Sequence, residues 1–377
     1  MTTLLIGADL CPIGRNRPFF EAGDAESLFH DLLPEFAAAD LVIANLECPL
    51  IARSTPILKT GPVFGEASTC IQAIQRAGID VLCLANNHIL DHGPEGLQNT
   101  LEVCAKAGID TVGAGPNLEA ARRILVLEAA GCRVGILAMA EHEFSIAGKN
   151  RWGANPLDVM DCVRNIQSRK HDFDYLIVLL HGGDEFHVPS PRLRDTCRFL
   201  VEMGADAVIV QHPHCLGGWE AYQDGYIVYG QGALAMDEAI YQRSQSFHEG
   251  FLVKLEIEPG RPSKLQVIPF VQSEPVPGAR RLTGERERLF RLELEGKSHQ
   301  VQDDAAVEAA WLRFCQREIH GYISSMLGHN RVLSLLNRNG LASRLLYSRI
   351  ALLRAKNIAC CETHREAIAT IFNQNLI

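Results

Sequence analysis

Side chains that commonly bind divalent metals recur at several points along this chain. Each of them follows an apolar, strand-like run and precedes a glycine-rich or turn-forming segment. Carboxylate and amide oxygens together with imidazole nitrogens are the donors that a site for two divalent metals requires. The chemistry that such a set supports is metal-assisted hydrolysis. The residues are Asp9, Glu47, Asn87 followed by His88, His181, and the pair His212 and His214.

The most specific local pattern is the segment 84–93, which reads LANNHILDHG. Asn87 offers an amide oxygen to a metal, whereas His88 is placed to reach the substrate. Asp91 lies close enough in sequence to hydrogen-bond the His88 imidazole and raise its basicity, which suits a general acid that protonates a leaving group. Turn formation explains the Asn-Asn pair equally well. It does not explain a histidine and an aspartate directly after so apolar a strand.

The other donors are weak signals when each is taken alone. Asp9 after a first strand would more often cap a helix or turn. Glu47 would more often form a surface ion pair, and His181 would more often be a structural histidine. His212 and His214 flank a proline, and in an extended segment residues two apart point to the same side, so these two can serve neighbouring metals. The prediction of a metal site therefore depends on the fact that all these residues occur together at the ends of predicted strands.

Short apolar runs alternate with helical patterns through the body of the chain. Strands separated by helices predict an α/β layered fold with parallel strand pairing. Because the loops after parallel strands gather along one edge of a sheet, donors that are distant in sequence can meet there. The apolar runs are 41–44, 81–85, 134–140, 176–180 and 207–210, and helical patterns cover 68–77, 96–107 and 191–203.

The pattern changes after residue 250. Residues 250–271 predict an antiparallel hairpin around a Pro-Gly turn. A polar, arginine-rich stretch follows, and then a long helical region from about 305 to 372. We therefore expect a main domain over 1–276, a polar connector over 277–304 and a C-terminal helical extension over 305–377. The apolar stripe predicted for that extension consists of Trp311, Cys315, Tyr322 and Met326.

Composition sets limits on the partners and the location. The chain has 377 residues, of which 47% are hydrophobic and 21% charged, as is ordinary for a globular protein. Its formal net charge of −9 argues against a nucleic-acid partner. The 12 cysteines include no CxxC pair, which favours free thiols in a reducing compartment. The N-terminus reads as a first strand, and no apolar run reaches the length of about 18 residues of a transmembrane segment. We expect a cytoplasmic protein.

The ordered motifs resemble those of a known family. They are Asp9, Asn45-Leu-Glu47, Asn86-Asn-His-x-x-Asp-x-Gly93, His181-x-Gly-x-Glu185 and His212-Pro-His214. This set is similar to that of the CapA-type bacterial capsule-synthesis proteins, also called poly-gamma-glutamate synthesis proteins, a branch of the calcineurin-like metallophosphoesterase superfamily. The likeness covers about the first two thirds to three quarters of the chain, and its third and fifth motifs are the specific ones.

This resemblance implies a sandwich of two mixed β-sheets flanked by helices, with the metal site at the strand ends. It also implies roles for individual residues. One metal would be held by Asp9 and His214, the other by Asn87, His181 and His212, and Glu47 would bridge them. His88 would be the acid near the leaving group, oriented by Asp91. The residues expected to contact the substrate, or to support those that do, are Arg15, Asn45, Lys59 and Glu185.

Three positions depart from the pattern of the superfamily or the family. Metallophosphoesterases usually carry a histidine two residues after the first aspartate, whereas this chain has Cys11 at that position. CapA-type proteins commonly lack this histidine as well. A small buried residue is favoured at Cys11 over a thiolate ligand. The family tryptophan after the fourth-motif histidine is Gly182, and an expected asparagine is replaced by Ala233. These changes bear on occupancy of the first metal site and on substrate choice.

Two functions follow as expectations. The first is a hydrolase in which one or two divalent metals, Mn, Fe or Zn rather than Ca, activate water for attack on a phosphoester or a related bond of a small-molecule or polymer substrate. Its setting would be the biosynthesis of capsule, poly-gamma-glutamate or exopolysaccharide. The second is an accessory protein with little or no catalysis that binds polymer or a partner in capsule assembly.

Overall fold

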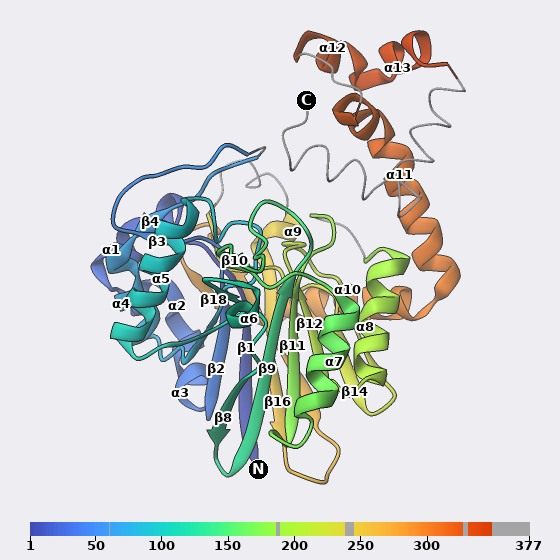
Figure 1. Cartoon of the computed structure of the whole chain (residues 1–377). Coiled ribbons are helices and arrows are strands. Elements are labelled where there is room, and N and C mark those ends of the chain that lie inside the picture. The colour runs from blue at the N-terminus through green and yellow to red at the C-terminus, as the bar shows by residue number, and fades with distance from the viewer. Residues whose placement is uncertain (60, 186–188, 238–244, 327–330, 349–377) are drawn as a thin grey trace. The chain divides into compact units, whose positions relative to one another are not determined.

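The computed structural model describes residues 1–59, 61–185, 189–237, 245–326 and 331–348. The chain divides into two compact units, Met1–Glu308 and Ala309–Ile377, which are described separately. All the predicted site residues belong to the first unit. Two mixed β-sheets flanked by helices form that unit, so the predicted fold class is confirmed (Figure 1).

The larger sheet contains eight strands and is built around β1. The neighbours of β1 are β2 and β15, which run parallel to it, and β16, which runs antiparallel. Strands β16 and β17 form the predicted hairpin, since Glu249 pairs with Val271 and Glu256 with Lys264. The strands in spatial order are β18 (Ala279–Arg281), β17 (Lys264–Gln272), β16 (Glu249–Ile257), β1 (Thr2–Leu10), β2 (Leu41–Leu46), β5 (Val81–Cys83) and β6 (Asp110–Val112), with β15 (Ala233–Ala235) beside β1.

The second sheet contains six strands, of which the central four are parallel and the two outer ones antiparallel to their neighbours. Two short ladders complete the described strands. In spatial order the six strands are β13 (Trp219–Tyr222), β14 (Gly225–Val228), β12 (Ala207–Gln211), β11 (Tyr175–His181), β9 (Cys132–Ala140) and β8 (Leu125–Ala129). The short ladders pair β3 (Leu50–Ile51) with β4 (Glu66–Ala67), and β7 (Ala114–Gly115) with β10 (Gly153–Ala154).

The uninterrupted apolar sequence of β11 is explained by burial of both its faces. Ile177 and Leu179 belong to the core cluster shared with the larger sheet. Leu176, Val178 and Leu180 face the other way, into a cluster that includes residues of α7 and α8. Successive strand residues point to opposite faces, so a strand between two apolar layers carries no polar alternation. Figure 1 shows α7 and α8 over this sheet.

Several helices of the first unit begin at a residue whose side chain caps them, and α1 and α5 end at a glycine in the left-handed conformation. The side chain of Ser190 accepts a hydrogen bond from the Leu193 amide at the start of α8, and Asp158 caps α7 in the same way. Gly108, with φ of 72°, ends α5 in the left-handed conformation. The helices of the first unit are α1 (Arg17–Ala22), α2 (Ala25–Phe29), α3 (Leu33–Ala37), α4 (Ile71–Arg76), α5 (Gly93–Ala107), α6 (Leu118–Ala121), α7 (Val159–Arg169), α8 (Pro191–Glu202), α9 (Gln245–His248) and α10 (Gly284–Gln302).

Residues 277–304 contain ordered elements. Strand β18 pairs with β17, and α10 buries Phe290 and Leu294 among the core residues. The second unit comprises most of α11 (Asp304–Met326), with α12 (Arg331–Leu336) and α13 (Leu341–Leu346). Of the predicted apolar stripe, only the Trp311 side chain is among the described residues, and the chain beyond Ser348 lies outside them. The division into domains at 276 and 304 stays a prediction.

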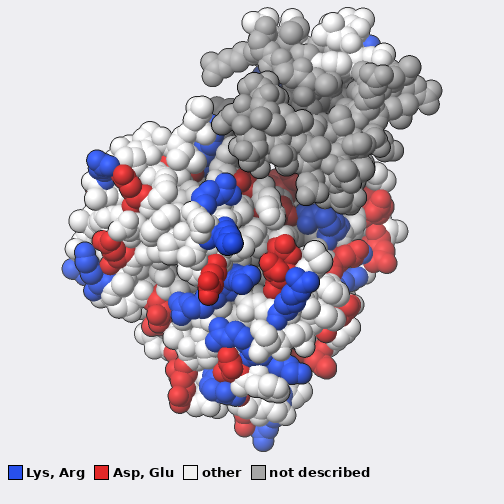
Figure 2. All heavy atoms as spheres, viewed as in Figure 1, with Lys and Arg blue, Asp and Glu red and all other residues white. Residues whose placement is uncertain are grey.

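Charged side chains of both signs lie on the described surface. On the face in Figure 2, lysine and arginine side chains lie interspersed with aspartate and glutamate side chains over the described surface. None of the described helices is both long enough and apolar enough to cross a membrane.

Candidate metal centre

The predicted metal-binding side chains meet where strands of the two sheets end. Asp9 lies opposite Asn45 in the larger sheet, and His181 lies opposite Gln211 in the second sheet. Two groups of side chains result, and within each the candidate ligand atoms lie within 4.8 Å of one another. One group is Glu47, His181 and His212, and the other is Asp9, Glu47 and His214.

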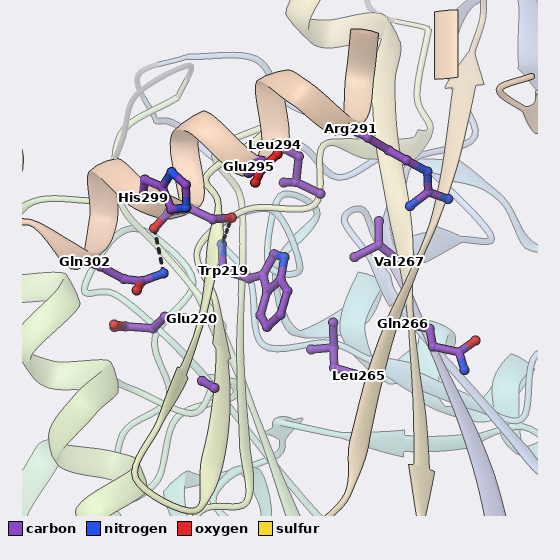
Figure 3. Close-up of a pocket in the computed structure, with 12 residues that line it drawn as sticks. Trp219, Glu220, Leu265, Gln266, Val267, Arg291, Leu294, Glu295, His299 and Gln302 are labelled. Carbon is purple, nitrogen blue, oxygen red and sulfur yellow. Dashed lines mark hydrogen bonds between the residues drawn. The ribbon is translucent and has the colours of Figure 1, made fainter. Parts of the chain in front are cut away.

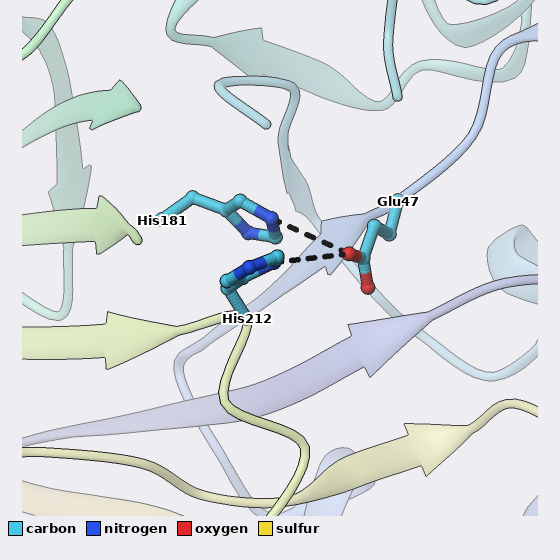
Figure 4. A group of neighbouring side chains, drawn as sticks. All are labelled: Glu47, His181 and His212. Carbon is cyan, nitrogen blue, oxygen red and sulfur yellow. Dashed lines mark ion pairs between the residues drawn. The ribbon is translucent and has the colours of Figure 1, made fainter. Parts of the chain in front are cut away.

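Glu47 is the member common to both groups. Its Oε1 lies 3.3 Å from Nε2 of His181 and 3.8 Å from Nδ1 of His212. Its Oε2 lies 3.6 Å from Nε2 of His214. Figure 4 shows the imidazoles of His181 and His212 both directed at the carboxylate. Each of these four side chains is less than 10% exposed, so the two groups share one buried carboxylate.

Asp9 and Asn87 extend this cluster at its two ends. Oδ2 of Asp9 accepts a hydrogen bond from the His212 amide at 3.0 Å and lies 3.3 Å from Nδ1 of His214. Oδ1 of Asn87 lies 3.1 Å from Nε2 of His181. All six predicted metal ligands are therefore brought together.

Asn45 and Asn86 connect the cluster to the backbone. Nδ2 of Asn45 donates to Asp9 at 2.8 Å and lies 3.4 Å from Nδ1 of His181, so Asn45 orients two candidate ligands. Its oxygen accepts a hydrogen bond from Asn86, which also donates to the Leu46 carbonyl. Asn86 was not predicted as a site residue. The Asn-Asn pair was a usable signal, but turn formation explains such a pair as well.

The donor set fits divalent metals on two observations. Oε2 of Glu47 and Nδ1 of His212 are buried without a hydrogen-bond partner among the described residues. Buried polar atoms are rarely left in that state unless an ion or water completes them. The set also mixes carboxylate, amide and imidazole donors, which are ligands of manganese, iron and zinc.

The charges in the cluster favour an ionised Glu47. Burial alone would raise the pKa of Glu47, but the nearby His214 and His181 outweigh that effect and hold it well below its usual value. Burial opposes protonation of His214 as well, yet Glu47 and Asp9 raise the pKa of His214 to about 9. Burial lowers the pKa of His181, so its imidazole is held in the neutral form that a metal requires.

His212 and His214 reach the cluster through an unusual backbone. Their φ angles are 96° and 50°, a region that residues other than glycine rarely adopt. The prediction that both side chains share one side is confirmed by their common contact with Glu47. The predicted reason, an extended segment, is wrong because left-handed turns produce the arrangement. Such strain persists where the surrounding structure enforces it, and it is concentrated at functional sites.

Beside the metal cluster lies the pair His88 and Asp91. Nδ1 of His88 is 2.6 Å from Oδ2 of Asp91, an arrangement that leaves Nε2 for another partner. Asp91 also accepts hydrogen bonds from Nζ of Lys59 at 2.6 Å and from the Phe64 amide at 2.8 Å. The ring of Phe64 lies against that of His88, with 4.5 Å between centroids. The pair is thus fixed from three directions.

The predicted substrate contacts lie in different settings. The Lys59 side chain is only 3% exposed and is ion-paired with Asp91. Arg15 forms a bidentate pair with Asp237, at 2.8 and 3.0 Å. Glu185 is exposed, and its charge contributes to the raised pKa of His214. Asn45 is buried within the cluster itself. The roles of these four residues in substrate binding stay predictions.

The three departures from the expected pattern have structural counterparts. Burial, followed by the hydrogen bond with Cys48, raises the pKa of the Cys11 thiol well above its usual value, which favours the small buried residue over the thiolate ligand. A Cβ placed on Gly182 would lie 2.5 Å from Cγ of Glu141, so this glutamate occupies the space beside it. Ala233 pairs directly with Asp9.

A separate groove lies between α10, β13 and β17 (Figure 3). It encloses about 820 Å³ and is lined by apolar residues such as Trp219 and Leu265 and by polar ones such as Glu295 and His299. None of the predicted site residues lines it.

Comparison with known proteins supports the resemblance noted in the sequence. A family model described as bacterial capsule synthesis protein PGA_cap matches residues 7–238. The capsule biosynthesis protein CapA of Bacillus anthracis is 26% identical over 294 residues, which cover 75% of this chain and 69% of that protein. The PGA biosynthesis protein CapA of Bacillus subtilis (strain 168) is 28% identical over 262 residues, covering 68% of each. A probable polyglutamine synthesis accessory protein of Mycobacterium tuberculosis is 28% identical over 261 residues, covering 62% of this chain and 69% of that protein.

The solved structures that align with this protein share little sequence identity with it. A putative 5'-nucleotidase from Staphylococcus aureus has a TM-score of 0.47 and 14% identity, covering 78% of this chain and 58% of that one. A phosphatase from Mycoplasma pneumoniae has a TM-score of 0.46 and 14% identity, covering 73% and 95%.

Proposed function

Because the chain belongs to the bacterial capsule synthesis protein PGA_cap family, we propose that it is a metal-dependent hydrolase acting in capsule, poly-gamma-glutamate or exopolysaccharide biosynthesis. The observation that carries this proposal is the position of Glu47 between His181, His212 and His214. A buried carboxylate among three imidazoles has little structural use, because hydrophobic residues of the same volume are often as stabilising.

The proposed ligands are the six side chains of the cluster. Asp9 and His214 would hold one ion, Asn87, His181 and His212 would hold the other, and Glu47 would belong to both sets of ligands. Bound Mn, Fe or Zn would supply Lewis-acid chemistry, lowering the pKa of water and offsetting negative charge that develops on a phosphoryl group. Asn45 keeps Asp9 and His181 in position through the hydrogen bonds described above.

His88 is the proposed proton donor to the leaving group. In hydrolysis of a phosphoester, an oxygen from water forms a bond to phosphorus, the bond from phosphorus to the leaving oxygen breaks, and that oxygen takes the proton of Nε2. The attacking water loses its own proton to the solvent. Asp91 holds Nδ1 at 2.6 Å and so directs Nε2 away from itself. Lys59 in turn holds Asp91, and Arg15 and Glu185 are proposed to contact the substrate.

We also propose a cytoplasmic location and a division of the chain into three parts. Nine cysteines of the described residues are buried and free, as is usual for proteins of a reducing compartment, and this supports a cytoplasmic location. Residues 1–276 are proposed to form the catalytic domain, with 277–304 linking it to the helical extension 305–377.

The alternative is an accessory protein that keeps the metal cluster with little or no turnover while it binds polymer or a partner in capsule assembly. One of the relatives above carries the word accessory in its name. The departure at Gly182, where Glu141 fills the space of the family tryptophan, also favours an altered substrate site.

The first test compares metal content with turnover. Metal per chain is measured by elemental analysis of the purified protein, and hydrolysis of bis(4-nitrophenyl) phosphate and 4-nitrophenyl phosphate is followed with and without Mn²⁺. We expect His212→Ala to lose bound metal. We expect His88→Ala to keep the metal and to lose turnover by about 10²- to 10⁴-fold.

The exposed His171 supplies the matched control, since His171→Ala should change neither quantity. Bound metal without turnover in the unmodified protein would favour the accessory function. Equal loss of metal in the His88 and His212 variants would overturn the division of roles.

A further inference from the structure

The helical hairpin 331–346 of the second unit carries apolar side chains on its outside. It consists of α12 and α13, joined by the turn 337–340, and both helices are labelled in Figure 1. Of the sixteen large apolar side chains that are exposed among the described residues, six belong to this hairpin, each between 56% and 76% exposed. They are Val332, Leu335, Leu336, Leu341, Leu345 and Leu346. Exposed apolar side chains gathered in this way mark a surface that binds a partner.

Polar residues occupy the inside of the turn. Asn337 and Ser343 are both buried, and two hydrogen bonds join them. Nδ2 of Asn337 donates to Oγ of Ser343 at 2.7 Å, and the Ser343 amide donates to Oδ1 of Asn337 at 2.7 Å. Gly340, with a φ of 73°, lets the chain reverse between the two helices. The turn is therefore held by polar contacts, which leaves the leucines on the outside.

Positive charge accompanies the exposed leucines. Arg338 and Arg344 are exposed on the same hairpin. Around it, residues 319–361 contain six arginine or lysine residues and no aspartate or glutamate, although the chain as a whole carries a formal net charge of −9. Leucines interspersed with basic residues on short helices are typical of a segment that lies in the interface of an anionic membrane.

We propose that the hairpin 331–346 is a membrane-binding surface that docks the chain on an anionic lipid bilayer. Its leucines enter the boundary between headgroups and acyl chains, and Arg338 and Arg344 contact the lipid phosphates. Each helix has six residues, whereas a membrane span takes about 20, so the hairpin lies on the bilayer and does not cross it. This role is separate from the proposed hydrolase, whose residues belong to the first unit.

Charge favours lipid over the other partners that could cover exposed leucines. In a symmetric dimer formed through this surface, the arginines of both copies would meet without an acidic residue between them, and like charges at an interface repel. A nucleic acid would neutralise the arginines but would leave six apolar side chains in water. A bilayer with anionic headgroups matches both the charge and the apolar surface.

Cosedimentation of the full chain with lipid vesicles tests the proposal. We expect binding to vesicles of equal parts phosphatidylcholine and phosphatidylglycerol, little binding to phosphatidylcholine alone, and weaker binding at high salt. Arg338→Gln combined with Arg344→Gln should lower the partition coefficient about 30-fold, about fivefold for each charge. Leu335→Gln combined with Leu345→Gln should lower it by at least about tenfold, because apolar burial is lost while glutamine keeps a favourable helix propensity.

Matched controls come from exposed residues of the first unit. Arg164→Gln in α7 and Leu292→Gln in α10 make the same changes at side chains that are also exposed, and both variants should bind vesicles like the unmodified protein. Leu335→Phe combined with Leu345→Phe should retain binding, since phenylalanine also enters the interface. Circular dichroism verifies the helix content of each variant.

Several outcomes would overturn the proposal. One is equal binding to both kinds of vesicle, and another is binding to neither. A third is a leucine variant that binds anionic vesicles as tightly as the unmodified protein, because the attraction would then be purely electrostatic. A fourth is a dimer that forms without lipid and is lost in the leucine variant, which would assign these side chains to a second copy of the chain. All these measurements are independent of hydrolysis.

Discussion

The ammonium of Lys59 is buried against Asp91 and His88, although it comes from a largely exposed segment. In the proposed mechanism, Lys59 would position His88 through Asp91. Three donors converge on the Asp91 carboxylate, from His88, Lys59 and the Phe64 amide. Removing the lysine would leave Asp91 with two of these three donors, so its carboxylate and the His88 ring would be held less firmly.

For Lys59→Met we therefore expect kcat to fall about tenfold or more on esters with poor leaving groups. The loss should be smaller on 4-nitrophenyl esters, whose leaving group needs little protonation. Removal of one partner of a buried ion pair should also cost about 3 kcal/mol in the free energy of unfolding. The measurements are a series of aryl esters and urea denaturation, with Lys59→Arg as the conservative variant. Equal losses across the series would contradict a role through His88.

Cys11 provides a second prediction at this scale. Burial and the hydrogen bond with Cys48 raise the pKa of the Cys11 thiol, so we expect Cys11 to serve as a small buried residue. Cys11→Ala should leave the metal content unchanged and lower the free energy of unfolding by about 1 kcal/mol, the cost of a small cavity. Elemental analysis and urea denaturation test this. Loss of one metal per chain would instead make Cys11 a ligand.

Sequence reasoning at the residue scale identified the candidate donors and the pairing of Asp91 with His88, but not Asn86 or the contacts that hold Asp91. Aspartate, glutamate, asparagine and histidine identify themselves by type and by their place after apolar runs. The buried contact of Lys59 has no such signal, because it depends on how segment 52–64 closes over residues 86–91. This closure is a tertiary contact of irregular backbone, and no local periodicity encodes it.

At the scale of elements, the strands of the body were predictable because most are buried on both faces. The stretch 277–304 reads as a polar connector, yet it forms β18 and α10. Helix α10 buries little beyond Phe290, Leu294, Ser298 and Val301, and its surface carries ion pairs such as Arg288 with Glu285. A helix that is polar around most of its circumference gives a weak periodic signal.

The turn before β12 yields a pH-dependent prediction. Burial raises the pKa of Asp206 from 3.8 to about 6, and its Oδ2 accepts a hydrogen bond from the Leu176 amide at 2.6 Å. Between these pH values the folded chain binds more protons than the unfolded chain, so the contribution of Asp206 to stability falls as pH rises and is lowest above pH 6.

Asp206→Asn keeps the acceptor and removes the buried charge. We expect it to raise the free energy of unfolding by about 1 kcal/mol at pH 4.5 and by up to about 3 kcal/mol at pH 8. Urea denaturation at both pH values measures this, with the exposed Asp224→Asn as the control. A gain that does not grow with pH would show that the Asp206 charge is not the cause.

For the molecule as a whole, the metal cluster joins the two sheets. Asp9 lies near the end of β1 and Glu47 follows β2 in the larger sheet, whereas in the second sheet His181 ends β11, and His212 and His214 follow β12. An ion bound by both sets would act as a cross-link between layers that otherwise contact through apolar side chains. Each group takes its three donors from both sheets, and neither sheet supplies more than two of them.

Removal of metal should therefore destabilise the first unit. At a metal concentration 100 times the dissociation constant, binding adds about 2.7 kcal/mol, so a chelator should lower the Tm by roughly 5 to 10 °C. Calorimetry of the protein with and without EDTA tests this. His212→Ala should respond little to the chelator. An unchanged Tm in the unmodified protein would mean that the stability of the fold does not depend on bound metal.

The spread of the ligands along the chain also sets the order of events during synthesis. His214 leaves the ribosome about 200 residues after Asp9, which at the usual rate of translation is a delay of about 10 to 40 s. Until then the proposed centre lacks at least one of its ligands. If it binds metal with the full set of ligands, binding must wait until both sheets have been synthesised and packed together.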